Sequence, residues 1–156
     1  MLAPGTVDWS SSPYGWMRTN GPRSKSKLAK EIVTEWLRVN RVGFQLPKPG
    51  EGDHHLAIGR DRYTIHLALQ GKEGKLEFAM LREPGYGVDK VMLLGVEPLR
   101  VRVWRADCWW MKDLPTYRRD AQGFHNLSVD PDNVPTWLTE MARWEPYEDD
   151  PQLSIL

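Results

Sequence analysis

The apolar residues of segment 24–40 recur with the period of a helix. They lie four or five residues apart and form one stripe: Leu28, Ile32, Val33, Trp36 and Leu37. Such a stripe is typical of an amphipathic helix that packs one face against a core. Ser24 suits the N-cap position, because its hydroxyl can accept a hydrogen bond from a free backbone N–H. We therefore predict a helix over residues 24–40.

Residues 54–58 and 62–70 predict a β-hairpin around Gly59, which supplies the positive φ that a tight connection often needs. Side chains alternate along the second segment. Tyr63, Ile65, Leu67 and Leu69 share one face, and Arg62, Thr64, His66 and Ala68 share the other. With the turn centred near Arg60, residue 54 faces residue 66, and a slip of one residue puts 55 opposite 66 instead.

Two later segments predict short helices. The apolar spacing of residues 76–83 favours one or two helical turns, which Pro84 ends because the residue before a proline is disfavoured in the helical region. Residues 128–144 carry another apolar stripe, and Pro135 suits the first turn of a helix there.

The remaining patterns predict strands and set the fold class. Residues 89–96 are continuously apolar, which favours a strand buried on both faces, whereas residues 99–105 alternate, which favours a strand nearer the edge of the sheet. We expect an α/β (α+β) fold with a central mixed sheet of about four or five strands flanked by helices. Residues 24–145 form one domain, after an irregular aromatic arm at 1–23 and before an acidic tail at 146–156.

Composition narrows the function classes. The formal net charge of the 156 residues is zero, which argues against a strongly basic nucleic-acid binder but allows a local basic patch. The single cysteine, Cys108, cannot form an internal disulfide, so we expect a cytoplasmic protein. No apolar run approaches the roughly 20 residues of a membrane span.

Local groups of basic residues are the candidate DNA contacts, since lysine and arginine neutralise phosphates. The residues concerned are Lys25, Lys27 and Lys30 in the predicted helix, and Arg118 and Arg119 near the C-terminal end. The alternative is that each group is a solvated face balanced by nearby acids. Eight tryptophans either pack the interior or form a surface for a protein partner, and a homodimer is compatible with both.

The segments "FAMLR" at 78–82, "VMLLGVEP" at 91–98 and "VRVW" at 101–104 follow the predicted hairpin in a fixed order. In order and spacing the chain resembles the restriction-endonuclease-like, or PD-(D/E)XK, nuclease superfamily over residues 24–113. The layout in question has a helix with an acidic residue, a hairpin opened by Asp with Glu-x-Lys on its second strand, a short helix and two more strands. This resemblance implies a restriction-endonuclease-like core and a phage, mobile-element or defence setting.

The same resemblance assigns the candidate catalytic residues. Glu35, or Glu31, takes the place of the helix acid, and Asp53 takes the place of the first ligand to Mg²⁺ or Mn²⁺. Thr64 falls where the family has its glutamate, and His66 falls where it has its lysine. A hydroxyl has no charge to offset a divalent cation, while an imidazole can exchange a proton near neutral pH and replace the lysine in part.

Two further arrangements stay open at this stage. Asp53, His66 and one of the adjacent His54 and His55 suit Zn²⁺ or another transition metal; the alternative is that they are ordinary polar residues of a sheet face. Glu77 is a possible migrated acid. The resemblance therefore leads us to expect a DNA-binding protein with a degenerate metal-nuclease site and weak or no cleavage. The alternative is a non-catalytic protein–protein interaction module on the same fold.

Overall fold

The computed structural model describes residues 25–81, 87–98, 100–107, 117–119 and 125–144. The elements in chain order are α2 (Lys25–Val39), β1 (Leu56–Ile58), β2 (Asp61–Leu69), β3 (Leu76–Leu81), β4 (Lys90–Val96), β5 (Val101–Asp107), β6 (Tyr117–Arg119), β7 (His125–Val129) and β8 (Thr139–Trp144). The predicted arm at 1–23 and the predicted tail at 146–156 lie outside the described residues. The helix predicted over 24–40 is confirmed as α2.

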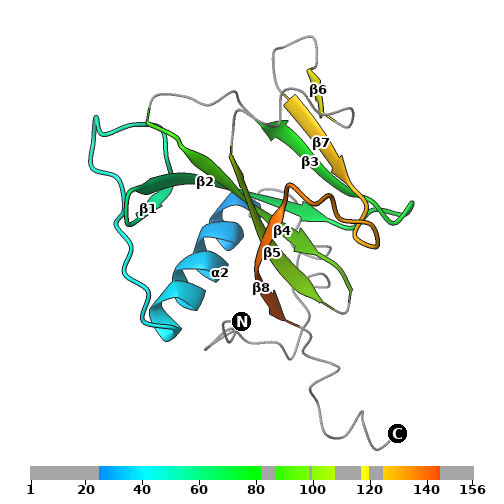
Figure 1. The fold of residues 1–156 in the computed structure, drawn as a ribbon, viewed down its shortest axis with the longest axis horizontal. Coiled ribbons are helices and arrows are strands. Elements are labelled where there is room, and N and C mark those ends of the chain that lie inside the picture. The colour runs from blue at the N-terminus through cyan, green and yellow to red at the C-terminus, as the bar shows by residue number, and fades with distance from the viewer. Residues whose placement is uncertain (1–24, 82–86, 99, 108–116, 120–124, 145–156) are drawn as a thin grey trace, which may run out of the picture.

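The strands form two sheets (Figure 1). The larger sheet is mixed and has the order β1-β2-β4-β5-β8, in which β2 and β4 are parallel and the other pairs are antiparallel. The smaller sheet is antiparallel and has the order β3-β7-β6. The fold is therefore mixed α+β, and the prediction of a mixed central sheet with about four or five strands is confirmed.

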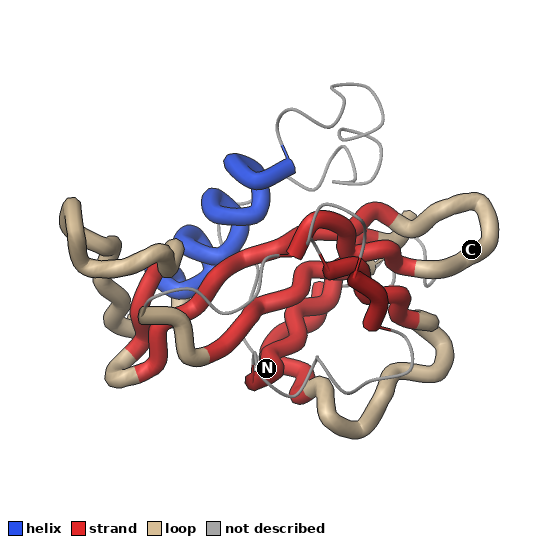
Figure 2. Tube along the Cα trace, turned by 90° about the horizontal axis from the view of Figure 1, so that it is seen from above, coloured by secondary structure: helices blue, strands red, loops and turns tan. Residues whose placement is uncertain are grey.

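Helix α2 lies on one face of the larger sheet, and Figure 2 shows it raised above the strands. Its buried stripe joins apolar side chains of the sheet in one core: Ala29, Ile32, Val33, Trp36 and Leu37. A second core on the opposite face includes Leu76 and Phe78 of β3 and Leu127 of β7. We expected helices to flank the sheet, but in the part of the chain that the structure describes the second face is covered by β3 and β7.

Both faces of the central strands are buried, as the apolar run at 89–96 predicted. Met92 and Leu94 of β4 belong to the core beside α2, and Val91 and Leu93 belong to the core beneath the smaller sheet. Gly95 lies on the same face of β4 as Val91 and Leu93. A Cβ atom there would lie 2.6 Å from Cδ1 of Leu76. Glycine at this position therefore lets the smaller sheet pack closely on β4.

The short helix predicted over 76–83 is wrong, because β3 occupies Leu76–Leu81. Leu76 and Phe78 point into the second core, while the carboxylate of Glu77 accepts a hydrogen bond of 2.9 Å from the Ser128 hydroxyl. Pairing with β7, about 50 residues later in the chain, decides the conformation. A short apolar run cannot reveal that distant partner.

The helix predicted within 128–144 is also wrong. Residues 125–129 form β7, and β8 (Thr139–Trp144) pairs with β5. Pro135 opens a single turn, in which the Leu138 N–H donates to the Pro135 carbonyl oxygen. Leu138 belongs to one core and Met141 packs against the other, so two residues of the predicted helical stripe lie on opposite sides of the sheet.

Strand β5 lies one place nearer the edge of the sheet than β4, as its alternation predicted, but β8 pairs along its outer side. The polar-looking face of β5 is buried. Arg102 is 5% exposed and Trp104 is 1% exposed. The guanidinium of Arg102 stacks 4.7 Å from the Trp104 ring, and its charge is paired with Glu97 at 3.2 Å. Arginine can therefore alternate with apolar residues inside a fully covered strand.

Candidate functional site

The β1–β2 turn sets which histidines can meet. Ile58 pairs with Asp61, so the loop contains only Gly59 and Arg60, and Gly59 has a φ of 60°. Positive φ at the first loop residue is the pattern of a type II′ hairpin turn. The predicted register is wrong by one residue, because we centred the loop on Arg60 instead of between Gly59 and Arg60. Leu56 lies opposite Tyr63, and neither residue 54 nor residue 55 lies opposite residue 66.

Thr64, His66 and His55 lie together, and we call them the imidazole cluster. Oγ1 of Thr64 and Nε2 of His66 are 3.0 Å apart in a hydrogen bond. Nδ1 of His55 accepts a hydrogen bond of 2.8 Å from the backbone N–H of Ile65. The two imidazole rings are tilted, with centroids 6.1 Å apart. His55 is therefore the residue that joins His66, as expected for only one of the adjacent pair.

Burial controls the charge of the imidazole cluster. It lowers the pKa of His66 from 6.5 to about 4, and neighbouring His55 lowers it further in the same direction. Burial, followed by the charge of Lys30 and by His54, lowers the pKa of His55 to about 4. Both rings are therefore neutral at pH 7. We expected His66 to exchange a proton near neutral pH, but its pKa lies too low for that exchange.

The predicted acids do not join this cluster as a metal centre. Asp53 is exposed before β1, Glu31 is exposed on α2, and Glu35 is half-buried on the same helix. Among the described residues, no three histidine, cysteine, aspartate or glutamate side chains gather closely enough to hold a metal ion. The assignment of Asp53 as a ligand for Mg²⁺ or Mn²⁺ stays a prediction.

The predicted DNA-contacting residues are spread over two elements. Lys25, Lys27 and Lys30 lie in the first half of α2, and Lys30 is exposed. Arg118 and Arg119 lie in β6, at the outer side of the smaller sheet. Cys108 and the neighbouring tryptophans fall outside the described residues.

Neither a protein-family model nor a curated protein matches this chain. The function must therefore be argued from the residues themselves. Across the described ranges, no helix is both long enough and apolar enough to cross a membrane.

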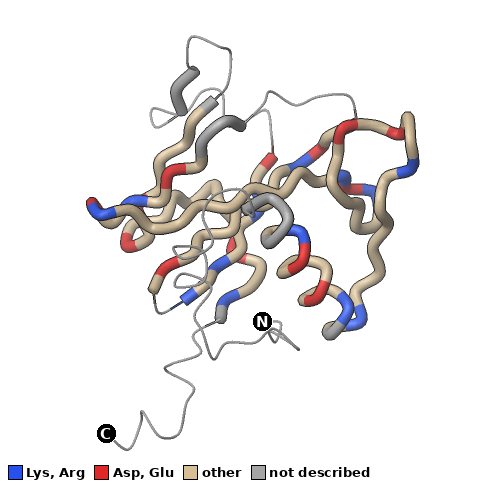
Figure 3. Tube along the Cα trace, turned by 180° about the vertical axis from the view of Figure 1, so that it is seen from behind, with Lys and Arg blue, Asp and Glu red and all other residues tan. Residues whose placement is uncertain are grey.

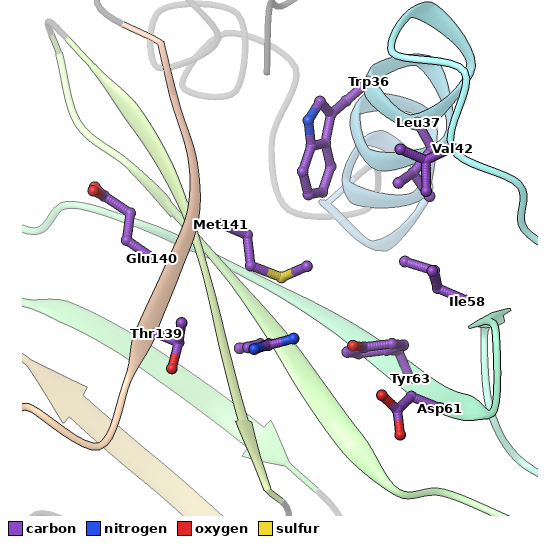
Figure 4. A pocket seen from close by; sticks show the side chains of 10 residues that line it. Trp36, Leu37, Val42, Ile58, Asp61, Tyr63, Thr139, Glu140 and Met141 are labelled. Carbon is purple, nitrogen blue, oxygen red and sulfur yellow. The ribbon is translucent and has the colours of Figure 1, made fainter. Parts of the chain in front are cut away.

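An open cleft of about 380 Å³ lies between α2 and β8, on the face opposite the smaller sheet. Figure 4 shows Trp36 and Leu37 on one side, Met141 across from them, and Tyr63 with Asp61 below. Met141 is the extra residue of a bulge in β8, because Ala142 pairs with Val103 while Glu140 pairs with Trp104. Sequence reasoning missed this cleft, since its walls come from segments about 100 residues apart.

Proposed function

We propose that this protein binds DNA on a restriction-endonuclease-like architecture and does not cleave it. The observation that carries the loss of cleavage is the hydrogen bond between Thr64 and His66. These residues fall where the resembling superfamily has Glu and Lys. The hydroxyl is neutral and bonded to the ring, and the ring is neutral at pH 7. The pair therefore offers neither the carboxylate that a hard divalent cation prefers nor the positive charge of a lysine.

The order of elements supports the architecture. Helix α2 is followed by the β1–β2 hairpin and, after β3, by the apolar strand β4 and by β5, which contains Trp104 and ends at Asp107. Strand β4 runs parallel to β2, so a crossover joins them. The departure is at residues 78–82, where the resemblance implies a helix and 78–81 instead belong to β3. The restriction-endonuclease-like core is thus part of the proposal.

Exposed cations support DNA as the partner. Some basic side chains are held in ion pairs within the fold: Arg62, Lys75, Lys90, Arg100, Arg102 and Arg143. Others are exposed and make no ion pair to a described residue: Lys30, Arg38, Arg41, Arg60 and Arg105. Figure 3 shows basic and acidic positions interspersed over the molecule. The proposal therefore requires these exposed cations, and not a single basic face, to contact phosphates.

The test is retention of the purified full chain on duplex DNA over a range of salt concentrations. We expect binding at low salt and a linear fall of log K with log salt, because each phosphate contact releases counterions. Absence of retention at low salt would contradict the proposal. For cleavage, plasmid is incubated with Mg²⁺ or Mn²⁺ beside an Asp53→Ala control. Nicking by the wild type that the control lacks would show a functional metal site and refute the loss of catalysis.

The resemblance has a test of its own. The double substitution Thr64→Glu with His66→Lys restores the family's residue types at both positions. Gain of metal-dependent nicking, absent from either single variant, would support the shared architecture directly. The single variants are the matched controls, because each introduces one charge without the pair.

A second candidate is protein binding through the cleft between α2 and β8. The observation in its favour is the apolar wall of Trp36, Leu37 and Met141 beside the polar side chains Asp61 and Glu140. Such a mixture suits a short amphipathic segment of a partner. This candidate predicts no retention on DNA and no steep salt dependence, so the same titration separates the two.

A further inference from the structure

A second hollow, of about 180 Å³, lies beside the β1–β2 turn, and we call it the turn pocket. Gln45, His54, Ala57, Arg60 and Arg62 are among the residues that line it. An isolated bridge between Gln45 and Ala57 brings the preceding loop against β1 and closes one side. The volume is below the roughly 300 Å³ at which pockets for drug-sized ligands begin. The turn pocket therefore suits a small ligand.

His54 is the unusual residue of the turn pocket. It is 6% exposed, and neither ring nitrogen makes a hydrogen bond to a described residue. Its Nδ1 atom is also shielded from solvent. Leaving a buried polar group without a partner costs about 1–3 kcal/mol, so native folds rarely do it without a reason. A ligand can reach this imidazole only through Nε2, because Nδ1 is shielded from solvent.

Arg62 is held in place beside this imidazole. Its Nε donates to Oδ2 of Asp89 at 3.3 Å. A Cβ atom on Gly87 would lie 2.9 Å from Nη1 of Arg62, the flexible end of that side chain, so the guanidinium lies close to Gly87. Gly87 also has a φ of 75°. Asp89 thus engages the Nε side of the guanidinium, which leaves its other N–H groups for a ligand.

Arg60 supplies a second cation at the tip of the turn. It is exposed and makes no ion pair to a described residue. Among the described residues of the lining, Glu51 is the one carboxylate, and its Oε2 already accepts a hydrogen bond of 2.6 Å from the Lys48 backbone N–H. The lining therefore presents N–H donors from both arginines, and Arg60 is the one whose charge is not already paired with Asp89. That combination favours an anion with several acceptor oxygens.

We propose that the turn pocket binds a phosphate group. Arg60 and Arg62 donate N–H groups to its oxygens, and His54 presents its imidazole to the same anion. The phosphate belongs either to a free phosphate or phosphomonoester, or to the backbone of DNA. The site itself does not depend on the proposed function, but the DNA source rests on it.

The experiment measures the affinity of the full chain for inorganic phosphate by calorimetry at constant ionic strength. The same protein is then titrated with a DNA duplex over a range of salt. Arg60→Ala and His54→Gln are the test variants. Lys72→Ala is the matched control, because it removes an exposed cation of the β2–β3 turn that does not line the pocket. Arg60 is on the surface, so its variant folds even if the His54 variant does not.

We expect both test variants to weaken phosphate binding about tenfold or more, and the control to change it less than about twofold. If Arg60→Ala also lowers the salt slope of DNA binding by about one, the phosphate is that of DNA. If phosphate binds and DNA does not, the turn pocket takes a free phosphate and the proposed function fails. If inorganic phosphate does not bind, or if both variants bind it as the wild type does, the turn pocket proposal is overturned, whatever the result with DNA.

Discussion

The imidazole cluster and the turn pocket treat neighbouring histidines in opposite ways. His55 accepts a hydrogen bond from Ile65, and His66 is bonded to Thr64. His54, one residue before His55, is more deeply buried than the polar groups around it and has no hydrogen-bond partner among the described residues. In the cluster one hydrogen bond ties His55 to β2 and another joins two side chains within β2, whereas Nδ1 of His54 in the turn pocket has no partner.

This difference shows that residue type alone does not locate a site. The sequence draws attention to Thr64 and His66 because of the face they share and the motif they replace. In the fold, the Thr64 hydroxyl and Nε2 of His66 form a hydrogen bond with each other. The imidazole available to a ligand is that of His54, which sits beside two arginines in the turn pocket. Whether the polar atoms of a residue are already bonded is therefore a better guide than the residue's identity.

The largest expected effect is the pH dependence of stability that the imidazole cluster creates. The pKa of His66 is lowered from 6.5 to about 4 in the folded state. Between these values the unfolded chain binds more protons than the folded one, so stability is full above pH 6.5 and falls as pH drops towards 4. A shift of this size corresponds to about 3 kcal/mol.

Urea denaturation at pH 7.5 and pH 4.5 measures this loss. His66→Gln removes the titrating ring, so the variant should lose less stability than the wild type over the same interval. The comparison between the two proteins removes the contribution of carboxylates that titrate in both. Parallel losses in wild type and variant would show that the ring is not buried as described.

The next largest effect is the contribution of the Thr64 hydroxyl to the free energy of unfolding. Thr64→Val keeps the shape of the side chain and removes the partner of His66 Nε2. We expect a loss of about 1–2 kcal/mol in the free energy of unfolding, since a part-buried polar atom loses its bond. Thr64→Ser is the control, because it keeps the hydroxyl. Equal stability of the Thr64→Val and Thr64→Ser variants would contradict a stabilising hydrogen bond between Thr64 and His66.

Removing the polar atoms of His54 in the turn pocket should not lower the free energy of unfolding, in contrast to their removal from the imidazole cluster. His54→Leu replaces an unbonded buried imidazole by an apolar side chain of similar size. We expect the free energy of unfolding to stay unchanged or rise by up to about 1 kcal/mol, because no hydrogen bond is lost. Thermal and urea unfolding measure the change. A loss above about 1 kcal/mol would mean that the fold uses this ring after all.

The smallest effect on stability is expected for Arg60→Ala. The side chain is exposed at the turn and makes no ion pair to a described residue, so stability should change by less than about 0.5 kcal/mol. Phosphate affinity should nevertheless fall as it does for His54→Gln. A loss of phosphate affinity without a loss of stability would show that the turn pocket serves binding, whereas the imidazole cluster serves stability. A destabilised Arg60→Ala variant would contradict this distinction.

Local patterns explain which parts of the fold are predictable. The stripe of α2, the alternation of β2 and the apolar run of β4 all lie within one element, and all three are confirmed. Strands β3 and β8 were predicted as helices, because their identity depends on pairing with β7 and β5, far away in the chain.

The same reasoning applies to the sites. Alternation along β2 places Thr64 and His66 on one face, and the structure confirms that placement. The turn pocket depends on a single bridge from Gln45 to Ala57 and on a close approach of Gly87 to Arg62. No periodicity marks either contact, and so sequence alone could identify His54 as a candidate but not its neighbours.

The most direct test of the central claim is one plasmid experiment at low salt with Mg²⁺ or Mn²⁺ present. Gel mobility reports binding, and the topology of the plasmid after deproteinisation reports cleavage. The account predicts that the protein retards the plasmid and leaves it supercoiled, with Asp53→Ala behaving identically. Nicked or linear plasmid with the wild type, and intact plasmid with Asp53→Ala, would contradict it.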